Sequence, residues 1–313
     1  MCGIAGWAGK VPQEAREAFE AFATQLLIET QSRGEHATGV AAYAGPNKRH
    51  VGKGPVDAKR FVKTPVWKKA LESLSAIGHC RWATHGSPTK NENNHPFESG
   101  KWSMIHNGVI GGHRYIAEKE GVRLVSECDS EVILRVFARG VKMGGPVAGL
   151  QRWVDASKDL HARYAIAILD HTNGAIRLLR DSGSPCSIVK LPALGIVAFA
   201  STSAILKAAM EHVQREYPGF PLLDGAEGWE CEEGKVYVLS PKTLEVEHER
   251  LNWPRQRTFG FGTYNSSKPT SGELTQLNSD EPEGDSENET VYCCTLCGRA
   301  EIDCMCEAET RPQ

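Results

Sequence analysis

The residue with the clearest chemical potential is Cys2, which follows Met1 and precedes Gly3. Initiator methionine is removed when a small residue comes next, so the sequence predicts a mature chain that begins with Cys2. Such a residue carries a thiol nucleophile and a free α-amine on one Cα atom. The amine has an ordinary pKa of roughly 7.7–8.0, so near neutrality part of it can accept the thiol proton. A chance cysteine after the start codon is the competing interpretation.

Four clusters downstream carry residue types that could bind and hydrolyse an amide. They are Arg33-Gly34 with Thr38-Gly39, Gly78-His79-Cys80-Arg81-Trp82-Ala83-Thr84-His85-Gly86, Asn94-His95-Pro96-Phe97 with His106-Asn107-Gly108, and Cys128-Asp129-Ser130-Glu131. Taken singly they are ambiguous. Arg81 is typical of a surface salt bridge, Asn107-Gly108 of a turn, and Asp129 of a helix N-cap. Their order along the chain is more informative than any one of them.

Together with Cys2, these clusters resemble the glutaminase domain of the class II glutamine amidotransferases. Those enzymes are N-terminal-nucleophile (Ntn) hydrolases, as in glucosamine-6-phosphate synthase and amidophosphoribosyltransferase. The resemblance covers roughly residues 2–210 and includes Asp181-Ser182-Gly183-Ser184-Pro185 and Ala198-Phe199-Ala200-Ser201. It implies hydrolysis of the side-chain amide of L-glutamine to glutamate and ammonia.

The resemblance assigns the catalytic roles to three residues. Cys2 is the nucleophile that forms a γ-glutamyl thioester, and its own α-amine is the general base and then the acid. The side-chain amide of Asn107 and the backbone N–H of Gly108 stabilise the oxyanion of the tetrahedral intermediate.

The same resemblance implies a set of substrate-binding residues. Arg81 binds the α-carboxylate of glutamine, for which a guanidinium offers two parallel hydrogen bonds, and Asp129 binds the α-ammonium. Trp82, Thr84 and His85 line the pocket, and the backbone of Gly108 contributes to it again.

Two groups of potential metal ligands lead to different expectations. The histidines at positions 79, 85, 95 and 106 include no i, i+4 pair on one predicted helix, so neither a catalytic metal nor another cofactor is expected. Near the end of the sequence, four thiols suit a small structural zinc site: Cys294, Cys297, Cys304 and Cys306. Unstructured, unligated thiols are the alternative, and the sequence leaves both open.

Hydrophobic periodicity predicts the elements that position these residues. Helical spacing covers residues 12–32, with Ala15, Phe19, Phe22 and Leu26 on one face, and helices are also expected at 129–139, 142–158 and 203–217. Short apolar or β-branched runs predict strands at 1–9, 40–44, 76–83, 102–106, 163–170, 175–180, 186–190, 195–200 and 235–239. Because the strands come in runs, the sequence favours an α+β architecture. The resemblance implies the four-layer αββα sandwich of Ntn hydrolases.

Composition divides the chain into three parts. Residues 2–255 are expected to form the glutaminase domain, and residues 256–290 are polar and acidic, as is typical of a disordered linker. Residues 291–313 form the cysteine-rich tail to which the zinc hypothesis applies.

Bulk properties exclude several classes of function. The formal net charge of −3 gives no basic field for nucleic acid. No apolar run approaches the ~18 residues of a membrane helix, and the N-terminus lacks the features of a secretory signal. A cytoplasmic protein is therefore expected, and homo-oligomerisation stays open.

The destination of the ammonia is the remaining question. Members of this family usually carry a large synthase domain, whereas the sequence after residue 255 is short and has no phosphate-cradling glycine-rich loop. The favoured hypothesis is a glutaminase that supplies ammonia to a synthase on a separate polypeptide. Alternatives are a stand-alone amidohydrolase of a γ-glutamyl conjugate and a non-catalytic glutamine-binding scaffold.

Overall fold

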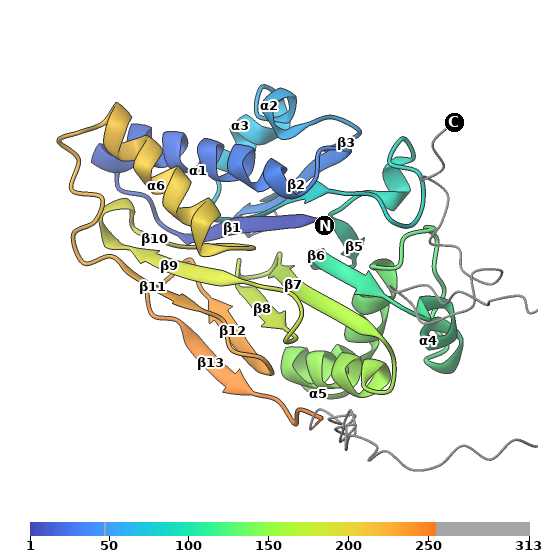
Figure 1. The fold of residues 1–313 in the computed structure, drawn as a ribbon. Coiled ribbons are helices and arrows are strands. Elements are labelled where there is room, and N and C mark those ends of the chain that lie inside the picture. The colour runs from blue at the N-terminus through green and yellow to red at the C-terminus, as the bar shows by residue number, and fades with distance from the viewer. Residues whose placement is uncertain (47, 255–313) are drawn as a thin grey trace, which may run out of the picture. The chain divides into compact units, whose positions relative to one another are not determined.

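The first sheet of the computed structural model contains seven strands (Figure 1). The structure describes residues 1–46 and 48–254. In spatial order the strands are β11 (Glu227–Glu230), β9 (Ser187–Leu191), β10 (Ile196–Ala200), β1 (Gly3–Gly9), β4 (Ser75–Arg81), β2 (Ala37–Gly45) and β3 (Lys48–Gly54). The predicted linker at 256–290 and the cysteine tail at 291–313, with its expected zinc ligands, lie outside the described residues.

The second sheet contains six strands. Their order is β13 (Glu247–Arg250), β12 (Lys235–Leu239), β8 (Ile176–Arg180), β7 (Ala162–Asp170), β6 (Trp102–Ile110) and β5 (Phe97–Ser99). Every strand pair in both sheets is antiparallel.

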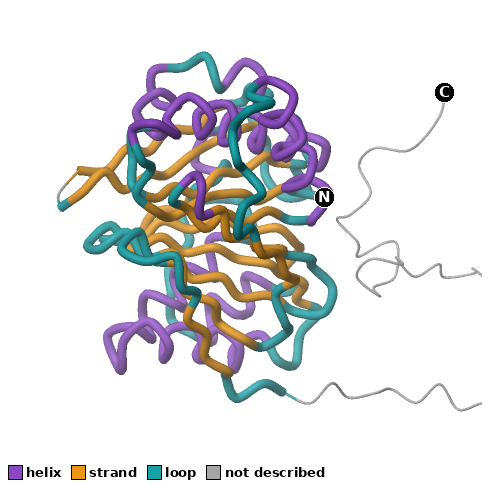
Figure 2. The backbone as a smooth tube through the Cα atoms, turned by 90° about the vertical axis from the view of Figure 1, so that its left-hand side faces the viewer, coloured by secondary structure: helices purple, strands orange, loops and turns teal. Residues whose placement is uncertain are grey.

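Helices cover the outer face of each sheet, so that four layers result (Figures 1 and 2). Over the first sheet lie α1 (Arg16–Thr30), α2 (Ala58–Phe61), α3 (Pro65–Leu71) and α6 (Ser203–Glu216). Over the second lie α4 (His113–Lys119) and α5 (Glu131–Ser157). Short 3-10 turns are η1 (Gln13–Ala15), η2 (Gln31–Arg33), η3 (Asn91–Asn93) and η4 (Pro192–Leu194). The predicted α+β sandwich of the αββα type is confirmed.

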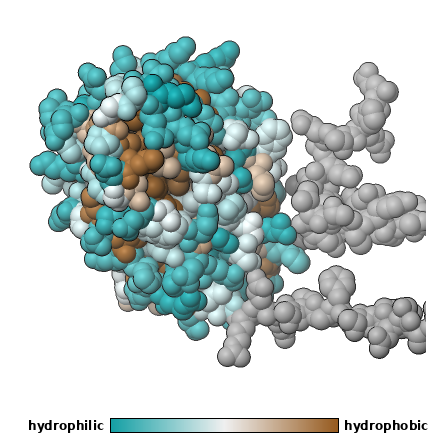
Figure 3. Space-filling view, turned by 60° about the vertical axis from the view of Figure 1, so that its left-hand side comes forward, coloured by the Kyte–Doolittle hydropathy of each residue, from teal (hydrophilic) through white to brown (hydrophobic). Residues whose placement is uncertain are grey.

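Three apolar clusters hold the layers together. Between α1 and the first sheet, the predicted helix face is buried, since Phe19, Phe22 and Leu26 are at most 1% exposed. A second cluster lies between α5 and its sheet, and a third joins the two sheets through residues such as Ile77 and Ile105. Each such side chain contributes about 1.5–3 kcal/mol by leaving water. On the face that Figure 3 shows, hydrophobic residues also form one patch within a largely hydrophilic surface.

Strand β1 lies at the centre of the first sheet, between β10 and β4. Its register pairs Gly3 with Cys80, which brings the residue before Gly3 to the end of β4 at Arg81. Gly6 is required in this crowded centre, because a Cβ there would lie 2.3 Å from the carbonyl oxygen of Ala76. The pairing of β1 with its two neighbouring strands therefore fixes the position of the residue before it, Cys2.

Candidate active site

The thiol of Cys2 lies against the backbone of Trp82, immediately after β4. The N–H of Trp82 donates to Cys2 Sγ at 3.4 Å, and Sγ lies 3.4 Å from the Trp82 carbonyl oxygen. Cys2 is half-buried, and loss of water around its thiol raises the thiol pKa, whereas the Trp82 hydrogen bond and the charge of Arg81 act in the opposite direction. Burial therefore favours the protonated thiol over the thiolate.

Two side chains fix the backbone that carries this thiol. Arg33 donates through Nε to the carbonyl oxygen of Cys2 at 2.9 Å. Ser201 accepts the N–H of Ile4 through Oγ at 2.9 Å, and its own N–H donates to the Ile4 carbonyl oxygen. The backbone of Gly34 packs directly against the backbone of Trp82. Only glycine allows this contact, because a Cβ at position 34 would lie 2.4 Å from the Trp82 nitrogen.

His36 holds the segment that follows β4 from the other side. Its ring stacks on that of Trp82 with centroids 4.6 Å apart, and its Nδ1 accepts the N–H of Ala83 at 3.0 Å. The His36 N–H donates to the Arg81 carbonyl oxygen. Trp82 itself is 46% exposed at the rim of the site. Sequence reasoning missed His36, although it lies within the Arg33–Gly39 cluster.

Arg81 is nearly inaccessible, at 2% exposure. Its Nη1 donates to Asn94 Oδ1 at 2.9 Å, and its Nη2 donates to the carbonyl oxygens of Gly86, at 2.9 Å, and His85. The guanidinium thus organises the loop that follows β4. A surface salt bridge, the competing interpretation from sequence, is wrong.

Asn107 and Gly108 lie on β6, in the second sheet. The Asn107 side chain is buried, and its Oδ1 has no hydrogen-bond partner within the described residues. A buried acceptor without a partner is costly, and a bound polar ligand relieves that cost. Gly108 has φ of +150°, and a Cβ there would lie 1.9 Å from the carbonyl oxygen of Arg163. Only glycine fits this position.

Asp129 approaches the same strand from the start of α5. It is 2% exposed, and its Oδ2 accepts the N–H of Ile110 at 2.7 Å and lies 4.0 Å from His85 Nδ1. The N-cap of α5 is Ser130. The carboxylate of Asp129 therefore contacts both β6 and the loop after β4. Because Ser130 is the N-cap of α5, the N-cap interpretation of Asp129 from sequence is wrong.

The predicted site residues come from four places that the fold brings together: the residue before β1, the end of β4 with the loop that follows it, β6, and the start of α5. Arg81 and Asp129 both act electrostatically on the Cys2 thiol, and Asp129 is bonded to the strand that carries Asn107 and Gly108. Trp82 and His85 lie on the loop after β4. The exposed Thr84 lies between them, with its hydroxyl 3.4 Å from His85 Nδ1.

Three buried histidines lie close to the predicted site residues. His79 and His95 stack with ring centroids 3.9 Å apart, and His79 Nε2 lies 2.9 Å from the carbonyl oxygen of His106. Burial lowers the pKa of all three, that of His79 to about 3. Within the described parts of the chain, no group of three or more His, Cys, Asp or Glu residues could hold a metal ion.

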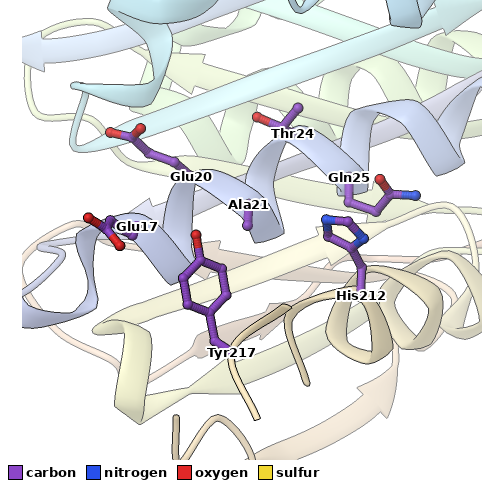
Figure 4. Close-up of a pocket in the computed structure, with 7 residues that line it drawn as sticks. All are labelled: Glu17, Glu20, Ala21, Thr24, Gln25, His212 and Tyr217. Carbon is purple, nitrogen blue, oxygen red and sulfur yellow. The ribbon is translucent and has the colours of Figure 1, made fainter. Parts of the chain in front are cut away.

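A separate hollow of about 330 Å³ lies between α1 and α6. His212 and Tyr217 reach toward α1 across it (Figure 4). Its lining comprises Glu17, Glu20, Ala21, Thr24, Gln25, His212 and Tyr217. None of these is a predicted site residue.

Comparison with known proteins agrees with this geometry. Residues 79–208 match the family model described as a glutamine amidotransferase domain. The glutamine–fructose-6-phosphate aminotransferase of Aquifex aeolicus is 34% identical over 174 residues, which are 54% of this chain and 27% of that protein. Its namesake from Bacillus licheniformis is 30% identical over 220 residues, 68% of this chain and 34% of that protein. The chain thus spans about a third of the length of these curated relatives.

Solved structures show the same fold. The glutamine phosphoribosylpyrophosphate amidotransferase of B. subtilis superposes with a TM-score of 0.58 at 20% identity, over 80% of this chain and 49% of that one. A glutamine aminotransferase class-II domain protein from Silicibacter pomeroyi gives a TM-score of 0.50 at 15% identity, over 80% and 99%. Among the described residues, no helix is both long and apolar enough to cross a membrane. The chain therefore carries a class II glutamine amidotransferase domain with the Ntn-hydrolase fold.

Proposed function

We propose that this chain hydrolyses the side-chain amide of L-glutamine through a γ-glutamyl thioester on Cys2 and supplies the ammonia to a synthase on a separate polypeptide. The observation that carries the proposal is the position of the Cys2 thiol. It lies 3.4 Å from the Trp82 backbone nitrogen and within the electrostatic influence of Arg81 and Asp129.

Catalysis begins once Met1 has been removed and the α-amine of Cys2 is free. The amine accepts the Sγ proton, the thiolate attacks the amide carbon, and the C–N bond breaks as the leaving nitrogen takes up that proton. Water then attacks the thioester, the C–S bond breaks, and glutamate leaves with the thiol restored. The base is needed because burial raises the pKa of the Cys2 thiol.

Asn107 and Gly108 supply the oxyanion site in this proposal. The Asn107 carboxamide is buried, and the backbone of Gly108 has a φ of +150°. Donors that are fixed before the reaction lower the barrier, and removing one typically costs ~10²–10³-fold in rate.

Arg81 and Asp129 bind the two charged groups of glutamine. A carboxylate accepts more than one hydrogen bond, so Asp129 can bind the α-ammonium while it holds the N–H of Ile110. Nη1 of Arg81 has a second hydrogen beyond the one donated to Asn94, which suits the α-carboxylate. Trp82, Thr84 and His85 complete the pocket wall.

The separate synthase is the part of this proposal that the experiment below tests. The curated relatives that the chain matches are named for amination of fructose-6-phosphate. A sugar phosphate is accordingly the first acceptor to test.

The test is ammonia release from glutamine by the processed chain, alone and with proteins that co-purify with it. Wild type should release ammonia and Cys2→Ser should not. A glutamine-analogue electrophile should label Cys2 alone among the thiols. Strong turnover of a γ-glutamyl conjugate with none of glutamine would replace this proposal with a stand-alone amidohydrolase. Binding of glutamine without turnover would replace it with a scaffold.

A further inference from the structure

Asn93 joins two loops that the sequence separates by more than thirty residues. It ends η3 (Asn91–Asn93) and is fully buried. Its Nδ2 donates to the carbonyl oxygen of Ser87 at 3.1 Å and to Glu127 Oε2 at 2.9 Å. Its Oδ1 accepts the N–H of Glu127 at 2.9 Å. The carboxamide thus makes hydrogen bonds to both loops, two through Nδ2 and one through Oδ1.

The first of these loops leads directly to Arg81. Ser87 follows Gly86, whose carbonyl oxygen accepts from Arg81 Nη2 at 2.9 Å. Gly86 has φ of +74°, and a Cβ there would lie 2.6 Å from Asn93 Nδ2. The Asn93 side chain is therefore packed against the turn that holds the guanidinium.

The second loop leads directly to Asp129, two residues after Glu127. Glu131 anchors the same loop, since its Oε2 accepts the N–H groups of Val125 and Ser126 at 2.9 and 2.7 Å. The loop is thus held by Glu131 from α5 and by Asn93 from η3.

We propose that Asn93 is a positioning residue that sets the separation between Arg81 and Asp129. The inference rests on the proposed function, in which these two residues bind the α-carboxylate and α-ammonium of one glutamine molecule. Two charges on separate loops bind a small zwitterion well only when their spacing is fixed in advance. We call the hydrogen bonds of Asn93 to Ser87 and Glu127 the clasp. Lys90 also pairs with Glu127 at 2.9 Å, but this ion pair is exposed and cannot hold the two loops in place of the clasp.

The test compares L-glutamine with its analogue that lacks the α-amine. Asn93→Ala should lower kcat/KM for glutamine by roughly 10- to 100-fold, mainly through KM, because Asp129 no longer meets the ammonium. The analogue has no ammonium to misplace, so its kcat/KM should change less than about twofold. Glu118→Ala, an exposed substitution on α4, is the matched control and should change neither value.

A pair of substitutions that exchanges the carboxylate and the amide between positions 93 and 127 tests whether glutamine affinity can be restored. Asn93→Asp places a carboxylate against Glu127 and should lose glutamine affinity, whereas adding Glu127→Gln returns a donor to that contact and should recover part of it. Equal loss with both substrates, or no loss with either, would overturn the inference.

A second measurement separates this inference from the proposed function. Hydrogen exchange at the Glu127 amide should accelerate in Asn93→Ala, while amides of α1 keep their wild-type rates. Unchanged exchange at Glu127 overturns the clasp. If the wild-type chain releases no ammonia from glutamine, the proposed function is overturned. The hydrogen-exchange result then decides by itself whether Asn93 holds the loop at Glu127.

Discussion

Asp129 Oδ2 accepts the backbone N–H of Ile110 at 2.7 Å. This single bond ties the expected ammonium ligand to β6, two residues beyond Gly108. In the proposed function, the ammonium ligand and the oxyanion donors are therefore linked through strand β6. Substitutions at the two points should affect KM and kcat separately.

Asp129→Asn tests the binding half. Asn can still accept the Ile110 N–H through its oxygen, so the strand contact survives, but the charge that attracts the α-ammonium is lost. We expect KM for glutamine to rise by about 30-fold or more, because removal of one partner of a buried, hydrogen-bonded charge pair costs about 2–5 kcal/mol or more. Steady-state ammonia release measures this. An unchanged KM would remove Asp129 from the substrate-binding residues.

Gly108→Ala tests the oxyanion strand. The φ of +150° and the 1.9 Å approach to the Arg163 carbonyl oxygen leave no room for a methyl group. We expect a loss of at least about 2 kcal/mol in the free energy of unfolding, measured in urea, together with a fall in kcat. Gly54→Ala is the control, because nothing lies within 4 Å of its added Cβ, and it should stay within about 0.5 kcal/mol.

His36→Ala tests the support behind the nucleophile. Loss of the 3.0 Å bond to the Ala83 N–H and of the stacking on Trp82 should let the backbone that holds the Cys2 thiol shift, with a roughly 10-fold fall in kcat. His36→Asn retains an acceptor near the Nδ1 position and should recover most of the rate. Equal activity of both variants and wild type would show that this contact is dispensable.

Acid should destabilise the domain through His79. Burial lowers its pKa to about 3 in the folded chain, whereas the unfolded value is about 6.5. The unfolded state thus binds more protons between these two values, so stability falls as pH drops through that window. The slope is at most about 1.4 kcal/mol per pH unit for one proton. His79→Gln should reduce the slope of unfolding free energy against pH, and an unreduced slope would contradict the buried neutral ring.

The elements with strong periodicity could be predicted from sequence, and the short ones could not. Phe19, Phe22 and Leu26 of α1 follow helical spacing because one face of the helix is buried. Strand β7 reads as a nearly continuous apolar run because both of its faces are buried. By contrast β3, α2, α3, α4, β5, β11 and β13 have no sustained apolar pattern and form because neighbouring elements supply their contacts. The two helices expected at 129–139 and 142–158 are the two helical parts of α5, which Gly144 and Gly145 separate with non-helical backbone angles.

In the candidate site, too, some features could be predicted from the sequence and others could not. The order of the motifs and their resemblance to the class II glutaminase domain select Cys2, Arg81 and Asp129 as candidates, although each residue taken singly is ambiguous. The partners that hold them are set by tertiary packing. The 34-residue separation between Asn93 and Glu127 leaves no local pattern to detect, and neither does the burial of Arg81 beneath its own loop.

The most direct test is peptide mass mapping of the chain quenched in acid during glutamine turnover. A covalent γ-glutamyl group should be found on a terminal peptide that starts at Cys2, and hydroxylamine should release it as expected for a thioester. Ammonia production by a chain that retains Met1, or with the adduct on another residue, would contradict a nucleophile activated by its own liberated amine.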